Sequence, residues 1–192
     1  MQLQSTLARF AVLAFFLVSF SMLVHAVPLE NRDIGTGCNA GCETGNQLVL
    51  TLTKLKAGVE LNVGKIEAAV FNGTDPTEYL IAVTAAIQDT VATVIKFEVD
   101  LTATLNGKLT EIVALLVAII NTTVKGLYTA SGKITLQVFL GLVQQTDAAL
   151  KALLVAIVNL GAAVLVFVGA GVDAVKLVQI GLTYCANILG LN

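Results

Sequence analysis

Three cysteines are the side chains best suited to covalent chemistry in this chain of 192 residues. Cys38 and Cys42 lie in the stretch Cys-Asn-Ala-Gly-Cys, and Cys185 lies near the other end of the chain. A CxxxC spacing matches neither the CxxC of thiol oxidoreductases nor a zinc-binding pattern. The three cysteines are therefore disulfide candidates, and an odd number leaves one thiol free or paired between chains. The favoured bridge joins Cys185 to Cys38 or Cys42, and a local Cys38–Cys42 bridge is the alternative.

The other side chains give little support for catalysis. The only histidine, His25, precedes the predicted cleavage site described below, so a Ser-His-Asp or Cys-His site would lack its base. Neither GxxxxGK[ST] nor GxGxxG after a strand occurs. The carboxylate pairs Glu60 with Glu67 and Glu98 with Asp100 fit solvated helix faces better than a glycosidase site. We therefore predict a non-enzymatic protein with no catalytic residue, no cofactor and no metal site.

Two sequons would be N-glycosylation candidates in a secreted chain, Asn72-Gly73-Thr74 and Asn121-Thr122-Thr123. Asn72 is followed by Gly, Thr, Asp and Pro, which is typical of an exposed turn, so we expect this site to be used. Asn121 follows the apolar run Ile112–Ile120, and the sequence leaves its use open.

The N-terminal residues resemble a secretory signal peptide. Arg9 precedes the apolar run Phe10–Val24, and Val24-His25-Ala26 offers small residues where signal peptidase reads. The run is short for a membrane span, although an N-terminal anchor is the rival interpretation. We expect cleavage after Ala26 and a secreted, extracellular or cell-wall location, with a membrane location as the alternative.

Three regions follow from this interpretation: a signal peptide at 1–26, a polar segment at 27–43, and a helical domain at 44–192. The domain length suits one hydrophobic core. The formal net charge of the whole chain is −2, and no basic run interleaved with aromatic residues occurs. Nucleic-acid binding is therefore not expected.

Apolar periodicity predicts an all-α fold, a compact bundle of four to five helices with a very apolar C-terminal helix pair. A first stripe repeats every three or four residues at Leu48, Leu52, Leu55, Val59, Val63, Ile66 and Val70. Residues 48–52 also fit an alternating strand, and the many Val, Ile and Thr residues keep an all-β alternative open. A second helix is predicted from Asp75-Pro76, with Glu78 completing a capping box, to Asn106-Gly107. Further helices are expected over about 108–128, 133–160 and 161–188.

Charged residues become less frequent along the domain. It is more amphipathic to about residue 130 and strongly apolar from about 134. After Gln137 the only charged residues are Asp147, Lys151, Asp173 and Lys176. The segment Ala152–Val172 carries no charge, and as one helix it would reach roughly 31 Å, about the thickness of a bilayer core. A helix that is apolar all round is either buried or a membrane span. We favour a buried or surface-inserting helix. The alternative is an integral membrane protein, with Ile112–Val124 as a short second insertion.

The organisation of the chain resembles a known class of secreted proteins. A fungal-type signal peptide is followed by the stretch Pro28-Leu29-Glu30-Asn31-Arg32, a more polar N-terminal half and a very apolar C-terminal half. This order is similar to the small non-hydrophobin structural cell-wall proteins of mushroom-forming fungi, and loosely similar to fungal hydrophobic-surface-binding proteins. The resemblance implies a role in hyphal surface coating or attachment, and it transfers no functional residue. True hydrophobins carry eight cysteines, so that family is excluded.

A mean hydropathy of +0.86 is too high for the surface of an ordinary secreted monomer. We therefore expect the chain to bind a hydrophobic surface or a lipid, or to self-associate, with cell-wall polymers as further candidate partners. A secreted lipid carrier with an internal cavity is another alternative.

Overall fold

The structure is a computed structural model of the chain, and it describes residues 43–98, 105–160 and 164–191. The signal-peptide prediction, the 27–42 segment, and both Cys38 and Cys42 lie outside these ranges. All described regular structure is helical: seven α-helices and one short 3-10 helix, with no strand in these ranges. The all-α prediction is therefore confirmed.

The first apolar stripe forms α2 (Thr44–Phe71), the longest described helix. Its buried side chains include Leu48, Leu52 and Ile66, which repeat at helical spacing and point into the core. The strand alternative for residues 48–52 is wrong, because these residues continue the same helical stripe as the rest of α2.

The second predicted helix is α3 (Thr77–Val94), which is shorter than expected. The helix begins at Thr77 with Pro76 at the N-cap position, one residue later than predicted, and Asp75 precedes it. Asp75 Oδ1 accepts hydrogen bonds from the Thr77 backbone N–H at 2.9 Å and from the Thr77 hydroxyl at 2.6 Å. The prediction that this helix continues to Asn106-Gly107 is wrong. Its last turn is rich in β-branched residues, which favour helices weakly, and the chain then bends back so that the Glu98 carbonyl accepts the Thr44 hydroxyl at 2.7 Å.

Two long apolar helices follow the 3-10 helix η1 (Leu105–Gly107): α4 (Leu109–Ala130) and α5 (Leu136–Val158). Their bounds agree within a few residues with the predicted third and fourth helices. Both helices are long and apolar enough to cross a membrane by length and composition. About half of the most apolar window of each helix, 44 % and 50 %, is buried within the protein, and length and composition alone are weak evidence for a span.

The predicted fifth helix is instead three short helices: α6 (Val164–Gly171), α7 (Ala174–Ile180) and α8 (Thr183–Ile188). Asp173 separates the first two, because its side chain accepts the Lys176 backbone N–H and so starts α7. Gly181, with a left-handed φ of 88°, ends α7. The segment Ala152–Val172 is therefore not one helix: α5 ends at Val158, and α6 begins at Val164.

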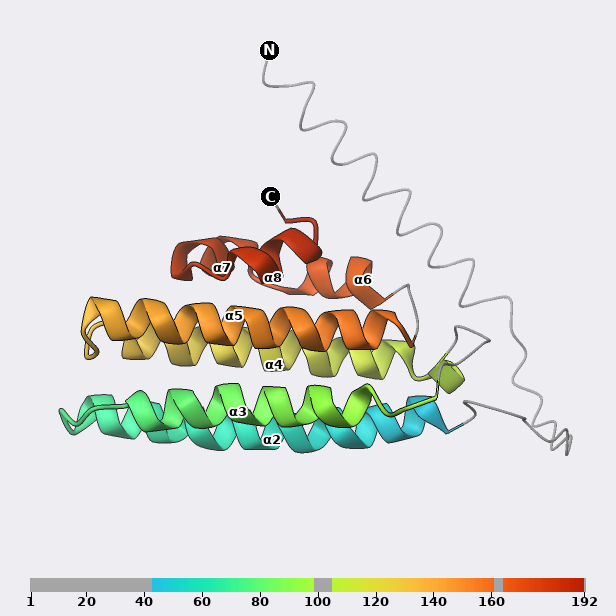
Figure 1. Cartoon of the computed structure of the whole chain (residues 1–192), viewed down its shortest axis with the longest axis horizontal. Helices are drawn as coiled ribbons and strands as arrows, with labels where there is room; N and C mark the ends of the chain where they lie inside the picture. Colours follow the sequence, from blue (N-terminus) through green and yellow to red (C-terminus); the bar gives the residue numbers. More distant parts are fainter. Residues whose placement is uncertain (1–42, 99–104, 161–163, 192) are drawn as a thin grey trace, which may run out of the picture. The chain divides into compact units, whose positions relative to one another are not determined.

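These helices stack in three layers (Figure 1). The first layer is the pair α2 and α3, and the second is α4 on α2 with α5 on α3. The third layer is α6, α7 and α8, which lie over α4 and α5. One continuous hydrophobic core runs through all three layers and includes Leu52, Ile87, Leu116, Leu150 and Leu177.

Candidate functional site

The carboxylates considered for acid–base catalysis are not brought together. Glu60 lies 3.0 Å from Lys56 on α2, and Glu67 of α2 lies 2.6 Å from Lys125 of α4, so both form exposed ion pairs. Glu98 lies in the turn after α3, and Asp100 lies outside the described residues. Within the described ranges, no cluster of three His, Cys, Asp or Glu side chains could hold a metal ion.

Cys185 is fully buried on α8, and within the described residues it forms no disulfide. Burial away from water, followed by the nearby charge of Asp147, raises the pKa of this thiol to about 12. A thiol that stays protonated in an apolar setting is a poor nucleophile and a poor metal ligand. The bridges predicted from Cys185 to Cys38 or Cys42 involve residues outside the described ranges, and those bridges remain predictions.

The two sequons lie in very different settings. Asn72 ends α2 in an exposed turn, and Gly73 next to it has a φ of 73°. This location confirms the predicted exposed turn, while the use of the sequon remains a prediction. Asn121 instead lies within α4, and the Thr123 of its sequon is 1 % exposed and donates its hydroxyl to the Ile119 carbonyl.

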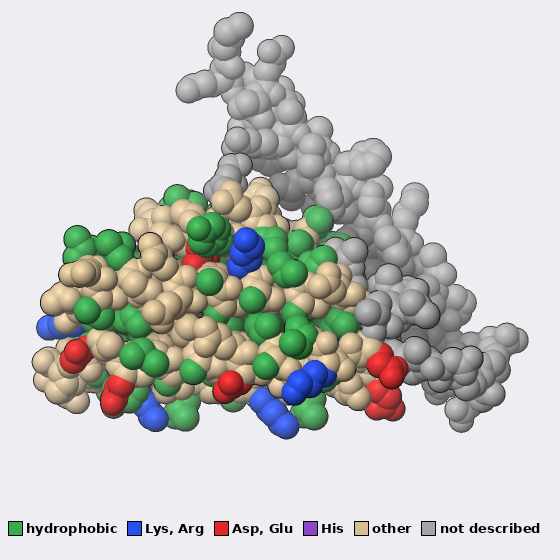
Figure 2. All heavy atoms as spheres, viewed as in Figure 1, with side chains coloured by type: hydrophobic (Ala, Val, Ile, Leu, Met, Phe, Trp, Pro, Cys, Tyr) green, Lys and Arg blue, Asp and Glu red, His purple; other side chains and the backbone are tan. Residues whose placement is uncertain are grey.

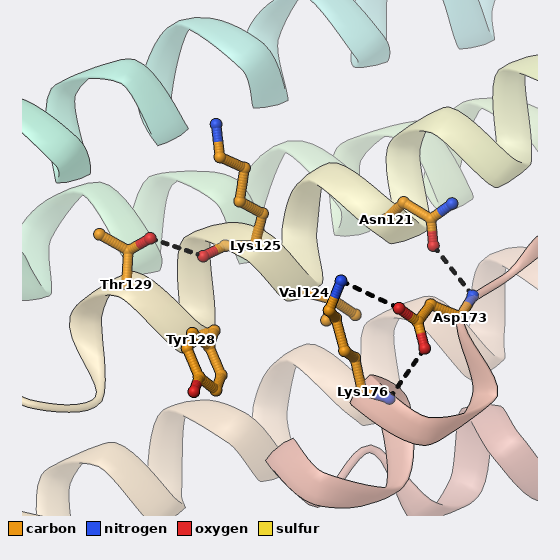
Figure 3. Close-up of a pocket in the computed structure, with 7 residues that line it drawn as sticks. All are labelled: Asn121, Val124, Lys125, Tyr128, Thr129, Asp173 and Lys176. Atoms are coloured by element: carbon orange, nitrogen blue, oxygen red, sulfur yellow. Dashed lines mark hydrogen bonds and ion pairs between the residues drawn. The ribbon is translucent and has the colours of Figure 1, made fainter.

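Asn121 faces a groove of about 450 Å³ between α4 and α7 (Figure 3). The Asp173 backbone N–H donates to Asn121 Oδ1 at 3.3 Å, and Asn121 Nδ2 donates to the Gly171 carbonyl at 3.4 Å. Both lysines on the groove wall are paired, Lys125 with Glu67 and Lys176 with Asp173 at 3.0 Å. The groove therefore offers no unpaired cation to an anionic ligand, and its polar groups join α4 to the short helices.

Asp147 on α5 is a buried polar residue that the sequence analysis did not single out for a role. Its side chain is 2 % exposed, and its two oxygens accept the backbone N–H groups of Tyr184 and Cys185, each at 2.8 Å. The carboxylate therefore satisfies the free N–H groups at the start of α8. A sequence signal was present, because Asp147 lies four residues after Val143 and three before Leu150 on the apolar stripe of α5.

Charge is divided unequally between the layers. The helices α2 and α3 carry seven charged side chains: Lys54, Lys56, Glu60, Lys65, Glu67, Glu78 and Asp89. From α5 to the last described residue there are four, of which Asp147 is buried and Asp173 pairs with Lys176. Lys151 is therefore the only exposed charge in that part without an ion-pair partner, and it lies 5.1 Å from the ring centre of Tyr184.

We call the solvent-facing surface of α5, α6, α7 and α8 the charge-poor surface. On the face shown in Figure 2, charged side chains gather along α2 and α3, whereas the part formed by α5–α8 is mainly apolar or uncharged. Large apolar side chains are exposed on it: Leu136, Val138, Leu140, Val155, Val166, Val175, Val178 and Tyr184. Exposed apolar residues occur on α2 and α3 as well, so the lack of charge is what distinguishes this surface.

One stripe of α5 shows the pattern most clearly. Leu140, Gln144, Ala148, Lys151 and Val155 follow each other at intervals of three or four residues, and all are exposed. Residues at this spacing lie on one side of a helix. The stripe thus presents one charge along most of the length of α5, a composition suited to contact with an apolar phase.

No protein-family model matches the chain, and no curated protein or solved structure is significantly similar to it. We therefore infer the function from the surface of the molecule and the packing of its helices.

Proposed function

We propose that this chain is a secreted, non-catalytic structural protein that binds hydrophobic surfaces or lipids through its charge-poor surface. Its location would be the cell wall or extracellular matrix of a fungus, where it would serve in hyphal surface coating and attachment. The signal-peptide pattern and the resemblance in organisation to fungal wall proteins support the location.

The observation that carries the proposal is the unequal division of charge between the layers. An apolar phase excludes charged groups, because removing a charge from water is costly. A molecule with seven charged side chains on α2 and α3, and over α5–α8 only the exposed pair Asp173–Lys176 and the unpaired Lys151, would therefore turn the second side toward such a phase. Contact between the charge-poor surfaces of two copies would also remove these surfaces from water. A second copy of the chain is therefore the competing partner.

The test is flotation of the purified protein with triolein droplets coated with phosphatidylcholine. The variant L140E/V155E places two charges on the stripe of α5, at positions that are 50 % and 40 % exposed. We expect the wild type to float with the droplets and this variant to bind at least about tenfold more weakly.

The matched control is L61E/I81E, which adds two charges to α2 and α3 at positions that are 62 % and 51 % exposed. We expect this variant to float like the wild type. A wild type that stays in solution, or an equal loss in both variants, would count against the proposal. Sedimentation without droplets distinguishes self-association, because concentration-dependent oligomers would then form.

An integral membrane protein remains the second candidate, since α4 and α5 have the length and composition of membrane spans. In that case the native protein would stay in membranes after carbonate extraction, whereas a wall protein would be released. A lipid carrier would instead hold a stoichiometric ligand, which mass spectrometry of native material would detect. The groove beside α7 and a second groove of about 390 Å³ between α2 and α3 are both open to solvent.

A further inference from the structure

The second layer of the fold is open along one side. The helices α2 and α3 pack against each other, α4 packs on α2, and α5 packs on α3. Consecutive antiparallel helices joined by a short connection usually pack side by side. Yet α4 and α5 barely contact each other, although only residues 131–135 separate them. Instead, α6 contacts both helices, α7 contacts α4, and α8 contacts α5.

We call α6, α7 and α8 together the cover. Its apolar side chains fill the opening between α4 and α5, and those that are fully buried are Val164, Val168, Leu177, Cys185 and Ala186. The contact with α4 is close, since a Cβ on Gly171 would lie 2.8 Å from Val117 Cγ2. Figure 1 shows the cover as a separate layer above α4 and α5.

Two polar contacts hold the cover at its edges. On α4, Asn121 bonds both Gly171, the last residue of α6, and Asp173 before α7, and Figure 3 shows the bond to Asp173. On α5, Asp147 accepts the first N–H groups of α8. The cover is thus fastened to both helices by hydrogen bonds and to α5 also by the contact of Lys151 with the Tyr184 ring, while its buried side chains make apolar, non-directional contacts.

The cover has little helical stability of its own. Its helices contain 8, 7 and 6 residues, whereas isolated helices shorter than about 12–15 residues are marginal in water. In contrast, α2–α5 are long and share buried residues such as Leu52, Ile87 and Leu116. The long helices therefore share apolar contacts that do not involve the cover, and the cover is the part of the core with the least helical stability of its own.

We propose that the cover leaves α4 and α5 at an apolar lipid surface, so that the faces it had covered become the main lipid-binding surface. This inference depends on the function proposed above, and it adds the location and exposure of the binding surface. In water the cover shields the apolar faces of α4 and α5 from solvent, and at a lipid surface acyl chains take its place. The charge-poor surface makes the first contact, and it includes the outer side of the cover itself.

A disulfide between the cover and α4 tests this inference. In the variant V117C/G171C the two Cβ atoms would lie 3.6 Å apart, within the range for disulfides, and the side chain that crowds Gly171 is removed. We expect the oxidised variant to bind triolein droplets coated with phosphatidylcholine at least about tenfold more weakly than its reduced form. Peptide mapping verifies the bridge, and its failure to form without droplets would contradict the docked position of the cover.

The chain offers a closely matched control in V63C/G126C, which joins α2 to α4. This pair is again a valine and a glycine, with Cβ atoms 3.7 Å apart, but it does not restrain the cover. We expect the oxidised control to bind droplets as tightly as its reduced form. If both bridges weaken binding equally, or if neither does while the wild type binds, then the cover does not need to leave.

Hydrogen exchange of the wild type gives a second measurement that needs no substitution. With droplets present, we expect amides of α6–α8 to lose protection while amides of α2 keep theirs. A cover that stays protected on the droplets would overturn the inference and leave the proposed function intact. A wild type that never binds droplets would overturn both.

Discussion

At the residue scale, Asp147 is the most unusual side chain of the described structure, because it is a buried carboxylate in the charge-poor part of the chain. It has no basic partner in its hydrogen bonds, and both its oxygens accept backbone N–H groups of α8. A carboxylate at the start of a helix replaces the water that those N–H groups would otherwise bind. This one residue therefore connects α5 to the last described helix.

We predict that Asp147→Ala lowers the free energy of unfolding by about 2 kcal/mol, because two N–H groups are left without an acceptor in a mostly buried setting. Asp147→Asn keeps one acceptor oxygen, so its loss should be about half as large. Urea unfolding followed by circular dichroism measures both values. An Asp147→Ala variant as stable as the wild type would show that water replaces the carboxylate.

The Cys185 thiol should resist alkylation in the folded protein and react quickly once the chain is unfolded. Its pKa of about 12 and its burial keep the thiolate concentration very low at neutral pH. Iodoacetamide labelling in buffer, in urea, and in urea with reductant distinguishes a buried thiol from a thiol held in a disulfide. If Cys185 were labelled in urea only after reduction, it would instead be in one of the disulfides predicted from the sequence.

The same thiol gives a dependence of stability on pH with a definite sign. Its pKa is 9.0 in an ordinary setting and about 12 when folded, so the unfolded chain loses this proton first as pH rises. Stability from this group is therefore complete below pH 9 and decreases as pH rises from 9 toward 12. Between pH 8 and 10 we expect the free energy of unfolding to decrease less in Cys185→Ala than in the wild type, as measured by urea unfolding at each pH. Equal losses in the two proteins would contradict this assignment.

At the element scale, the structure explains which features of the fold the sequence could predict. Polar residues separate the apolar positions of α2 regularly, so its period was predicted correctly, and the bounds of α4 were predicted to within about two residues. The early end of α3 and the division of the last helix could not be read from periodicity. They depend on tertiary contacts, such as Thr44 with Glu98, and on local features such as the left-handed Gly181.

Two glycines in long helices should respond in opposite directions to the same substitution. A Cβ on Gly126 of α4 would lie 2.8 Å from Val63 Cγ2, whereas a Cβ on Gly64 of α2 would have nothing within 4 Å. We predict that Gly126→Ala destabilises by about 1–3 kcal/mol through overpacking of α2 against α4. Gly64→Ala should stabilise by about 0.5–1 kcal/mol, because alanine favours the helix. Urea unfolding measures the free energy of unfolding of both variants. A lower value for Gly64→Ala than for the wild type would contradict the open space at that position.

The position of Asn121 within α4 makes a prediction about glycosylation. A glycan on its amide would occupy the space where Gly171 and Asp173 bond to it, so a folded molecule with a docked cover cannot carry one. In a secreting host we expect the glycan on Asn72 and none on Asn121. Peptide mapping after deglycosylation in heavy-oxygen water shows which asparagine was modified. Asn72→Gln should then remove the glycan mass, and Asn121→Gln should leave it unchanged.

At the scale of the whole molecule, the sequence indicated part of the candidate surface. The decrease in charge after about residue 134 predicted where the charge-poor region lies, and the structure places those residues in α5 and the cover. The sequence could not show that the cover fills an opening between α4 and α5. That arrangement depends on α4 and α5 packing on different partners, α2 and α3, and not on each other.

The charge distribution predicts how binding to an apolar surface should respond to salt. Lys151 is the only exposed charge without an ion-pair partner from α5 onward in the described residues, so electrostatic attraction contributes little. Raising sodium chloride from about 0.05 M to about 1 M shortens the screening length several-fold, yet flotation with phosphatidylcholine-coated triolein should stay the same or increase. Lys151→Gln should bind as the wild type does at both concentrations. A tenfold weaker binding at high salt would mean that the charged layer of α2 and α3 faces the droplet, the opposite of the orientation proposed here.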